Sequence, residues 1–522
     1  MGLSSLVNLF NRVPGFNRLR SPLIAMGQSV LLTSFTVTGL VVGLWTLGIF
    51  ERPGLALYDQ FVRLQPDRPP DERLLVVGIN EADLQGLTEW PLSDATLAQA
   101  LELLQVHQPR VIGVDVLRDI PIGGGRDRLL TQVQATNVVI VCKVSSASDP
   151  GVAPPAGLPP EAAVFADLVV DPGGTLRRSL LYLNPPPPPS PATPSHVCNM
   201  PETVVSLSFG MALNYLAGEG ITASFTDDDE LLIGSTLLPA LTSNFGSYQR
   251  ADVAGYQLML RYRAEESSVP MVSLTDVLNG QVADELIRDR IVLIGYTTPL
   301  AKDDFYTPYS ISRDDQQKMP GVIVHAQSTS QILSVVLDGR SLIADWPLLA
   351  VILWIGGWSL ATGVFAWYVK HPARFIPGLL VLSGTAYGAA LLLFWQGTWV
   401  PIVPVLVTVV TTSSSVVLVE RFNRGDYGKR FVDQVKTLLH IDVDIDEAKR
   451  HQQVAEITET EYFQNLKRTA KALRSRSKKN SPTSNAEATN PDAESATTQD
   501  YLADLKAKAR QLKHKPDSSH DK

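Results

Sequence analysis

The sequence predicts a mixed α/β domain held between transmembrane helices, one before the domain and three after it. Two features of the chain lead to this fold class. Apolar runs at 24–50, 347–369, 375–395 and 400–420 contain no charged residue except the final Glu420. The intervening segment 51–345 alternates short, wholly apolar runs with amphipathic ones, the pattern of buried strands and the helices that cover them.

Each of the four apolar runs has the length of a transmembrane helix, because about 20 apolar residues suffice to cross a hydrocarbon core. The first run could instead belong to a secretory signal peptide. It is, however, longer than the apolar part of such peptides, and no small-residue cleavage site follows it. We therefore predict four spans in the lipid bilayer, with the short segment 1–23 ahead of the first.

Basic residues near the runs predict the orientation, because Lys and Arg are enriched in cytoplasmic loops. Loop 396–399 has no charge, and three basic clusters fall on the other side of the membrane: Arg12, Arg18 and Arg20; Lys370 and Arg374; Arg421, Arg424, Lys429 and Arg430. We expect a multi-pass protein of the plasma (inner) membrane with both termini cytoplasmic and residues 51–345 extracytoplasmic. The expected interfacial anchors are Trp346, Trp395 and Trp399.

Within the domain, apolar runs and helical spacing predict the elements in order. Residues 57–63 form a short amphipathic helix, Leu74–Ile79 a buried strand, and 94–106 a helix that Ser93 or Asp94 can cap, before a strand at 110–116. Further strands are expected at 137–141, 258–261 and 290–294, an antiparallel addition at 176–183, and helices at 203–217, 274–279 and 321–337.

Residues 184–201 interrupt this pattern with a run of five prolines. Proline lacks the backbone donor that a sheet requires, so we expect a surface loop there.

Composition restricts the function classes. The 522-residue chain has a formal net charge of -8, which gives no indication of nucleic-acid binding. Its two cysteines, Cys142 and Cys198, both fall in the extracytoplasmic segment. They could form a disulfide in an oxidising compartment, or they could be two small buried apolar residues.

One set of short motifs occurs in a fixed order along the chain: Tyr58-Asp59, strand 74–79, Trp90-Pro91, and segments 109–115, 171–178, 291–295, 303–308 and 320–326. Together they resemble the extracytoplasmic sensor domain called CHASE2 of bacterial membrane proteins. The resemblance extends over 51–345, and it implies one membrane span before the domain and three after it. It also implies that the domain receives a signal from a small-molecule or protein ligand.

Ionisable and aromatic residues near strand ends are the candidate ligand contacts, because such groups often face a shared crevice. Structural roles are the alternatives: a hydrogen-bonded buried histidine for His325, a cap of the next turn for Asp115, packing for Trp90 and a turn for Asp303-Asp304. The candidate set is Asp59, Trp90, Asp115, Arg177, Asp304 and His325.

The segment after the last span contains no catalytic module. Residues 421–479 include a basic amphipathic helix that could lie on lipid or bind a partner, 480–500 read as a linker, and 501–522 as a short helix and tail. The basic residues of that helix are Lys467, Arg468, Lys471 and Arg474.

The resulting hypothesis is a sensor that relays ligand binding to a separate cytoplasmic signalling protein. A homodimer is a further partnership that this layout allows. The alternatives are an envelope docking or assembly protein and an enzyme. The enzyme hypothesis rests only on carboxylates that show no clustering in the sequence. No catalytic group, metal site or cofactor is predicted.

Overall fold

The computed structural model describes residues 16–190, 193–310 and 318–424. These residues include a mixed α/β domain and the long apolar helices expected on both sides of it. The segments 480–500 and 501–522 and nearly all of 421–479 lie outside the described residues, and so do Lys467, Arg468, Lys471 and Arg474.

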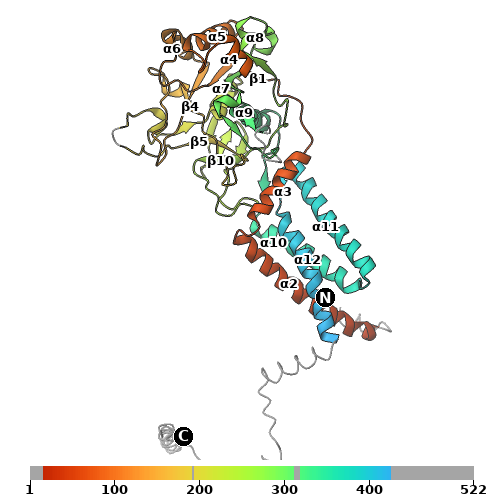
Figure 1. Cartoon of the computed structure of the whole chain (residues 1–522). Helices are drawn as coiled ribbons and strands as arrows, with labels where there is room; N and C mark the ends of the chain where they lie inside the picture. The colour runs from red at the N-terminus through yellow and green to blue at the C-terminus, as the bar shows by residue number, and fades with distance from the viewer. Residues whose placement is uncertain (1–15, 191–192, 311–317, 425–522) are drawn as a thin grey trace, which may run out of the picture. The chain divides into compact units, whose positions relative to one another are not determined.

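The centre of the domain is a six-stranded sheet in which all neighbouring strands run parallel (Figure 1). In spatial order its strands are β11 (Met271–Ser273), β1 (Leu74–Ile79), β12 (Ile291–Tyr296), β2 (Val111–Asp115), β3 (Val138–Cys142) and β4 (Ala163–Phe165). The strands predicted at 74–79, 110–116, 137–141 and 290–294 are therefore confirmed. β1 and β2 are not neighbours, however, because β12 lies between them and pairs with both.

Helices cover both faces of this sheet, as alternation along β1 requires. Leu74 and Val76 pack with α7 (Leu207–Gly218) and α9 (Gly321–Leu337). Leu75 and Val77 point to the opposite face. That face is covered by α5 (Asp94–Val106), α6 (Arg126–Val133) and α8 (Leu274–Leu278), with α4 (Glu81–Leu87) beside them.

Helix ends follow local capping chemistry. Ser93 accepts a hydrogen bond from the Thr96 amide and begins α5 at the predicted residue. The helix predicted over 203–217 starts later, because 204–205 form strand β6 (Val204–Val205) and Ser206 then caps α7.

A second sheet is antiparallel and has the order β10-β5-β6, with β10 at Tyr256–Met259 and β5 at Arg178–Leu183. It confirms the antiparallel addition predicted near 176–183. Smaller pairings are β7 (Ala223–Phe225), β8 (Leu231–Ile233) and β9 (Thr236–Leu238); β13 (Asp304–Phe305) and β14 (Met319–Pro320); and β15 (Ala344–Asp345) and β16 (Thr398–Trp399). Short 3-10 helices occupy Pro160–Ala162, Val197–Asn199, Asp284–Leu286 and Pro299–Ala301.

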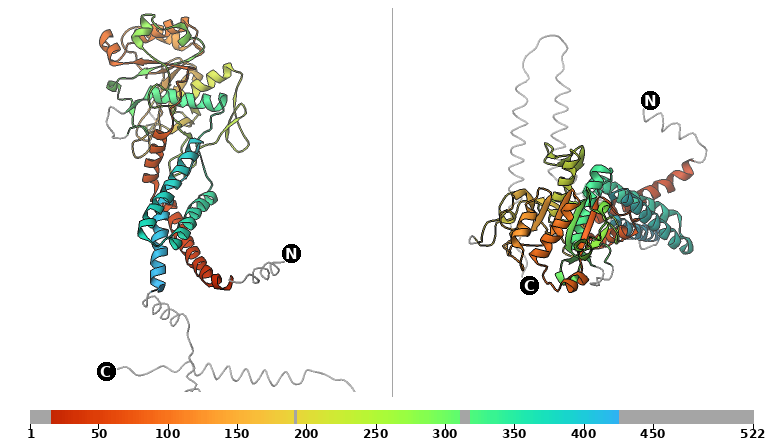
Figure 2. Two further views of the ribbon diagram at one scale, coloured as in Figure 1. Left: turned by 90° about the vertical axis from the view of Figure 1, so that its right-hand side faces the viewer. Right: turned by 90° about the horizontal axis from the view of Figure 1, so that it is seen from above.

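Four described helices contain stretches long and apolar enough to cross a membrane. They are α2 (Phe16–Thr46), α10 (Leu348–Tyr368), α11 (Pro372–Trp395) and α12 (Ile402–Arg424), drawn in red and in cyan to blue in Figures 1 and 2. The first span was predicted to end at Phe50, but α2 ends at Thr46. Gly48 adopts φ +82°, and its amide bonds the Trp45 carbonyl, so the chain turns before α3 (Glu51–Leu64) begins.

Three of the apolar helices share a buried polar contact. The Ser359 hydroxyl of α10 lies 3.3 Å from the Ser34 carbonyl of α2 and 2.9 Å from the Thr412 hydroxyl of α12. Such hydroxyls join helices that pack closely in a membrane. α11 is more peripheral, and its buried described residues are Ala386, Ala390 and Phe394.

In the proline-rich segment 184–201, the described residues 184–190 and 193–196 have no regular structure before the 3-10 helix at Val197–Asn199, as expected of a loop. Cys198 and Asn199 are nevertheless buried, and Cys198 is bonded to Cys142 of β3. The prediction of a surface loop is therefore wrong at these two positions, whereas Met200 and Pro201 at the end of the segment are exposed.

Candidate functional site

The six candidate residues do not form one site. They occupy three places. The first is the junction, where the domain meets α3 and the loop between α11 and α12. The others are the region before and within the first turns of α9, and a loop beyond the sheet. The junction holds Asp59 and Arg177, the α9 region holds Asp115, Asp304 and His325, and the loop holds Trp90.

At the junction, Asp59 of α3 and Arg177 form a two-pronged ion pair. The Arg177 Nε and Nη2 atoms donate to the two Asp59 carboxylate oxygens at 2.6 and 2.7 Å. Burial disfavours the charge on Arg177, but its hydrogen bonds to Asp59 and Asp171 raise its pKa above the ordinary arginine value. This pair links the helix that follows the first span to the start of β5.

Asp171 connects this pair to the rest of the domain. Its carboxylate accepts hydrogen bonds from Arg177 Nη1 at 2.6 Å, Arg178 Nε at 2.9 Å and the Tyr248 hydroxyl at 2.7 Å. Burial first, and then the Asp171 charge, raises the pKa of Tyr248 well above its usual value, so the phenol stays a donor. Two arginines and two carboxylates thus balance one another, with Asp171 and both arginines almost fully buried and Asp59 16% exposed.

An aromatic cluster lies beside this charge network. Trp399 of β16 is 1% exposed, and its ring centre lies 4.7 Å from Tyr58 of α3 and 5.9 Å from Tyr248. Gly246, at φ +59°, makes room for the indole, because a Cβ there would stand 2.2 Å from a ring carbon. Trp399 was predicted to be an interfacial anchor with a wet ring edge; it is instead part of the core.

Backbone contacts fasten the α11–α12 loop to the domain at the same place. β16 pairs in parallel with β15, and the Ala344 amide donates to the Gly397 carbonyl at 2.8 Å. Arg261 donates to the Trp395 carbonyl at 2.7 Å and to the Ser341 carbonyl at 2.8 Å. A single hydrophobic core therefore runs from the domain into α2, α3, α10, α11 and α12.

The second group of candidates gathers at the start of α9. A Cβ on Gly321, the first residue of α9, would stand 2.5 Å from Asp303 Oδ2. A Cβ on Gly295 of β12 would stand 3.2 Å from the Asp115 Cβ and 2.7 Å from Val322 of α9. Two carboxyl groups therefore lie near the positive end of a 17-residue helix.

Both of these carboxyl groups have a raised pKa. Burial raises the pKa of Asp115 to about 7, and its Oδ2 has no hydrogen-bond partner among the described residues. Burial, followed by the neighbouring charge of Asp115, raises the pKa of Asp303 to about 6. Both carboxyl groups therefore keep a proton to a higher pH than an exposed aspartate does.

His325 of the same helix has both ring nitrogens engaged. Nδ1 lies 2.9 Å from the Ser208 hydroxyl and Nε2 lies 3.2 Å from the Ala166 carbonyl. The Nε2–H therefore donates to the carbonyl, and Nδ1 accepts from the hydroxyl. Burial lowers the pKa of this imidazole, so it is neutral. This arrangement favours the structural role over the ligand-binding one.

Replacing Asp115 with asparagine should change how stability depends on pH. Because the folded-state pKa of about 7 exceeds the unfolded value, the folded protein binds more protons between about pH 4 and pH 7, and stability falls as pH rises through that window. Asp115→Asn should remove much of this fall and stabilise the protein at pH 8 by ~1 to 4 kcal/mol. Denaturant unfolding of the full-length protein from pH 4 to pH 8 checks this; an unchanged pH slope contradicts it.

Asp304 and Trp90 have other partners. Asp304 begins β13, just ahead of the expected turn at Thr307–Ser310, and its carboxylate lies 3.1 Å from Lys318 Nζ. Trp90 is 53% exposed and its ring packs edge-on against Tyr296, 5.6 Å between ring centres, after which a cis bond leads to Pro91. The contact with Tyr296 agrees with the packing role weighed for Trp90, and the role of lining a pocket stays a prediction.

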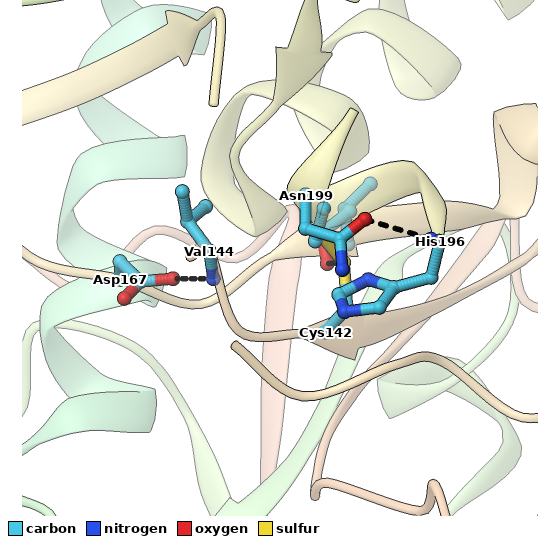
Figure 3. The surroundings of a disulfide bond; sticks show 7 residues. Cys142, Val144, Asp167, His196 and Asn199 are labelled. Carbon is cyan, nitrogen blue, oxygen red and sulfur yellow. Dashed lines mark hydrogen bonds between the residues drawn. A yellow bond between two sulfur atoms is a disulfide. The ribbon is translucent and has the colours of Figure 1, made fainter. Parts of the chain in front are cut away.

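The two cysteines are joined as a disulfide, drawn with its surroundings in Figure 3. The bond ties the end of β3 to the 3-10 helix of the proline-rich loop. Nearby, the His196 amide donates to the Asn199 side chain at 2.8 Å, and the Val144 amide donates to Asp167 at 2.8 Å (Figure 3).

Sequence reasoning missed Asp171 and Tyr248 as parts of the junction. A usable signal was present for Asp171, because it opens an Asp-Pro-Gly-Gly turn just before Arg177 and Arg178. Nothing local marks Tyr248. In the described part of the chain, no group of three or more His, Cys, Asp or Glu side chains could hold a metal ion.

The parallel α/β domain shares its core with the apolar helices that precede and follow it in the chain. This defines a class of protein in which a domain is packed against its own membrane anchors. The comparison with protein families gives the particular member of that class. The chain belongs to the CHASE2 family, whose domain matches residues 36–364. CHASE2 domains are sensor domains usually found in signalling proteins. No curated protein matches the chain, and no solved structure does.

Proposed function

We propose that this protein is a membrane sensor. Its CHASE2 domain lies outside the plasma membrane, detects a small molecule or a protein, and relays binding through the four helices to a separate cytoplasmic partner. The protein itself carries no catalytic step in this proposal. The observation that carries it is the junction, where one core and one charge network join the domain to the ends of the helices.

Two features support the sidedness. Lys370 and Arg374 lie at or next to the α10–α11 connection, at the ends of the helices remote from the junction, whereas loop 396–399 beside the domain has no charge. The disulfide between Cys142 and Cys198 favours an oxidising compartment for the domain.

The junction supports the relay. A ligand shifts an equilibrium only through its preference for one of two states, and packed elements pass such a shift on as rigid bodies. Arg177 binds Asp59 of α3, the helix that follows α2. The paired strands β15 and β16 directly precede α10 and α12. Movement of the domain would therefore act on three helices at once.

Single-cysteine labelling together with spin-label mobility tests the proposal. Asp227→Cys, on an exposed turn of the domain, should react with a membrane-impermeant maleimide in cells whose outer barrier is open, and His371→Cys should react only after permeabilisation. A spin label at His371 should change its mobility when Trp399→Ala loosens the junction, and should not change with the surface variant Arg128→Ala. Reversed labelling would refute the sidedness. An unchanged spin label would refute the relay and leave the docking role.

A further inference from the structure

A pocket lies at the ends of α10, α11 and α12 that are remote from the domain. Its volume is about 370 Å³, within the range of ligand-binding cavities. Its walls combine the apolar side chains of Val369, Phe375 and Ile376 with the charged ones of Lys370, Glu420 and Arg421.

The charges around this pocket are predominantly positive. Lys370 pairs with Glu420, and its ammonium lies 5.2 Å from the ring centre of Trp367. Arg421, which lines the pocket, is exposed and has no ion-pair partner among the residues that the structure describes. The first turn of α11, which supplies Phe375 to the wall, adds the positive end of a helix dipole.

The position of the pocket along the candidate spans indicates which kind of anion it binds. The candidate spans Leu348–Tyr368, Pro372–Trp395 and Ile402–Arg421 all end at it, so it lies where the hydrocarbon core gives way to polar headgroups. Ile376 and Leu380, 61% and 68% exposed and one helical turn apart, continue its apolar wall along α11. A soluble anion would make no use of that wall.

We propose that this pocket binds the headgroup of an anionic phospholipid, with Arg421 contacting the phosphate and an acyl chain lying along Ile376 and Leu380. Guanidinium groups suit phosphate oxygens because they donate in a fixed fork. Basic pockets between helices at the membrane surface recognise lipids in this way. The proposal goes beyond the sensor function and does not depend on it.

Native mass spectrometry of the full-length protein from nanodiscs tests the proposal. The nanodiscs contain phosphatidylcholine with a minor share of phosphatidylglycerol, and retention of each lipid is measured. The wild type should retain phosphatidylglycerol selectively. In R421Q this retention should fall about tenfold, equivalent to ~1.4 kcal/mol of binding. E420Q removes the competing carboxylate and should increase retention.

The matched control is R52Q, which removes one exposed cation at the domain end of the helices. It should retain the lipid as the wild type does. Equal retention in R421Q and the wild type, an equal loss in the control, or no preference over phosphatidylcholine would overturn the proposal. Displacement of the lipid by soluble glycerol 3-phosphate at similar concentration would replace it with a free-anion site. Unchanged thermal midpoints in pure phosphatidylcholine show that the variants fold.

Discussion

Replacing Asp171 with alanine should lower the free energy of unfolding of the domain by about 3 to 5 kcal/mol. The side chain is nearly inaccessible and accepts hydrogen bonds from Arg177, Arg178 and Tyr248. Removing it leaves two almost fully buried guanidinium groups with Asp59 as their remaining carboxylate partner in this network. Breaking one partner of a buried pair costs far more than the pair contributes as a whole.

Denaturant unfolding of the full-length protein, followed by pulse proteolysis, measures this loss. The control is Glu102→Ala, which removes the partner of Arg128 in an exposed pair whose side chains are 36% and 55% accessible. Exposed pairs contribute ~0 to 1 kcal/mol, so Glu102→Ala should hardly shift the transition. Similar losses in the two variants would mean that Asp171 is better hydrated than its contacts indicate.

The second large effect is expected at Trp399. Trp399→Ala should cost about 3 to 5 kcal/mol, because it empties a site between Tyr58 and Tyr248. Trp395→Ala is the matched control; that ring is 39% exposed, so the loss should be smaller. Unfolding monitored as for Asp171 gives both values.

A double-mutant cycle with Gly246 makes the test at Trp399 sharper. In the wild-type background, Gly246→Ala introduces a left-handed alanine and a methyl group 2.2 Å from an indole carbon. In the Trp399→Ala background only the backbone cost remains, ~1 to 2 kcal/mol. Gly246→Ala should therefore be markedly less harmful there. Additive effects would show that the indole and Gly246 do not contact each other.

Elements with local signals could be predicted from the sequence. The helix at 94–106 begins after a capping serine and has regular apolar spacing, and the helix at 321–337 begins directly after Pro320. Their bounds match the prediction. The end of the first span was placed four residues late, because hydropathy does not register the left-handed turn at Gly48.

Features that depend on distant residues could not be predicted. The position of β12 between β1 and β2 is set by pairings across some two hundred residues of chain. Trp399 reads as an anchor when only its neighbouring spans are considered, since the space that Gly246 leaves for it is invisible in the sequence. The role of Asp171 could not be predicted either, because its partner Tyr248 lies 77 residues away in the sequence.

The central place of β12 has a consequence for how the chain matures. Until Ile291–Tyr296 leave the ribosome, β1 and β2 are separate edges that expose unpaired backbone groups. The junction can form only later, because β15 pairs with β16, which lies between the last two spans. Membrane insertion of the final helices is thus a step in completing the domain, and chaperones that bind the emerging domain would meet an incomplete sheet until β12 is made.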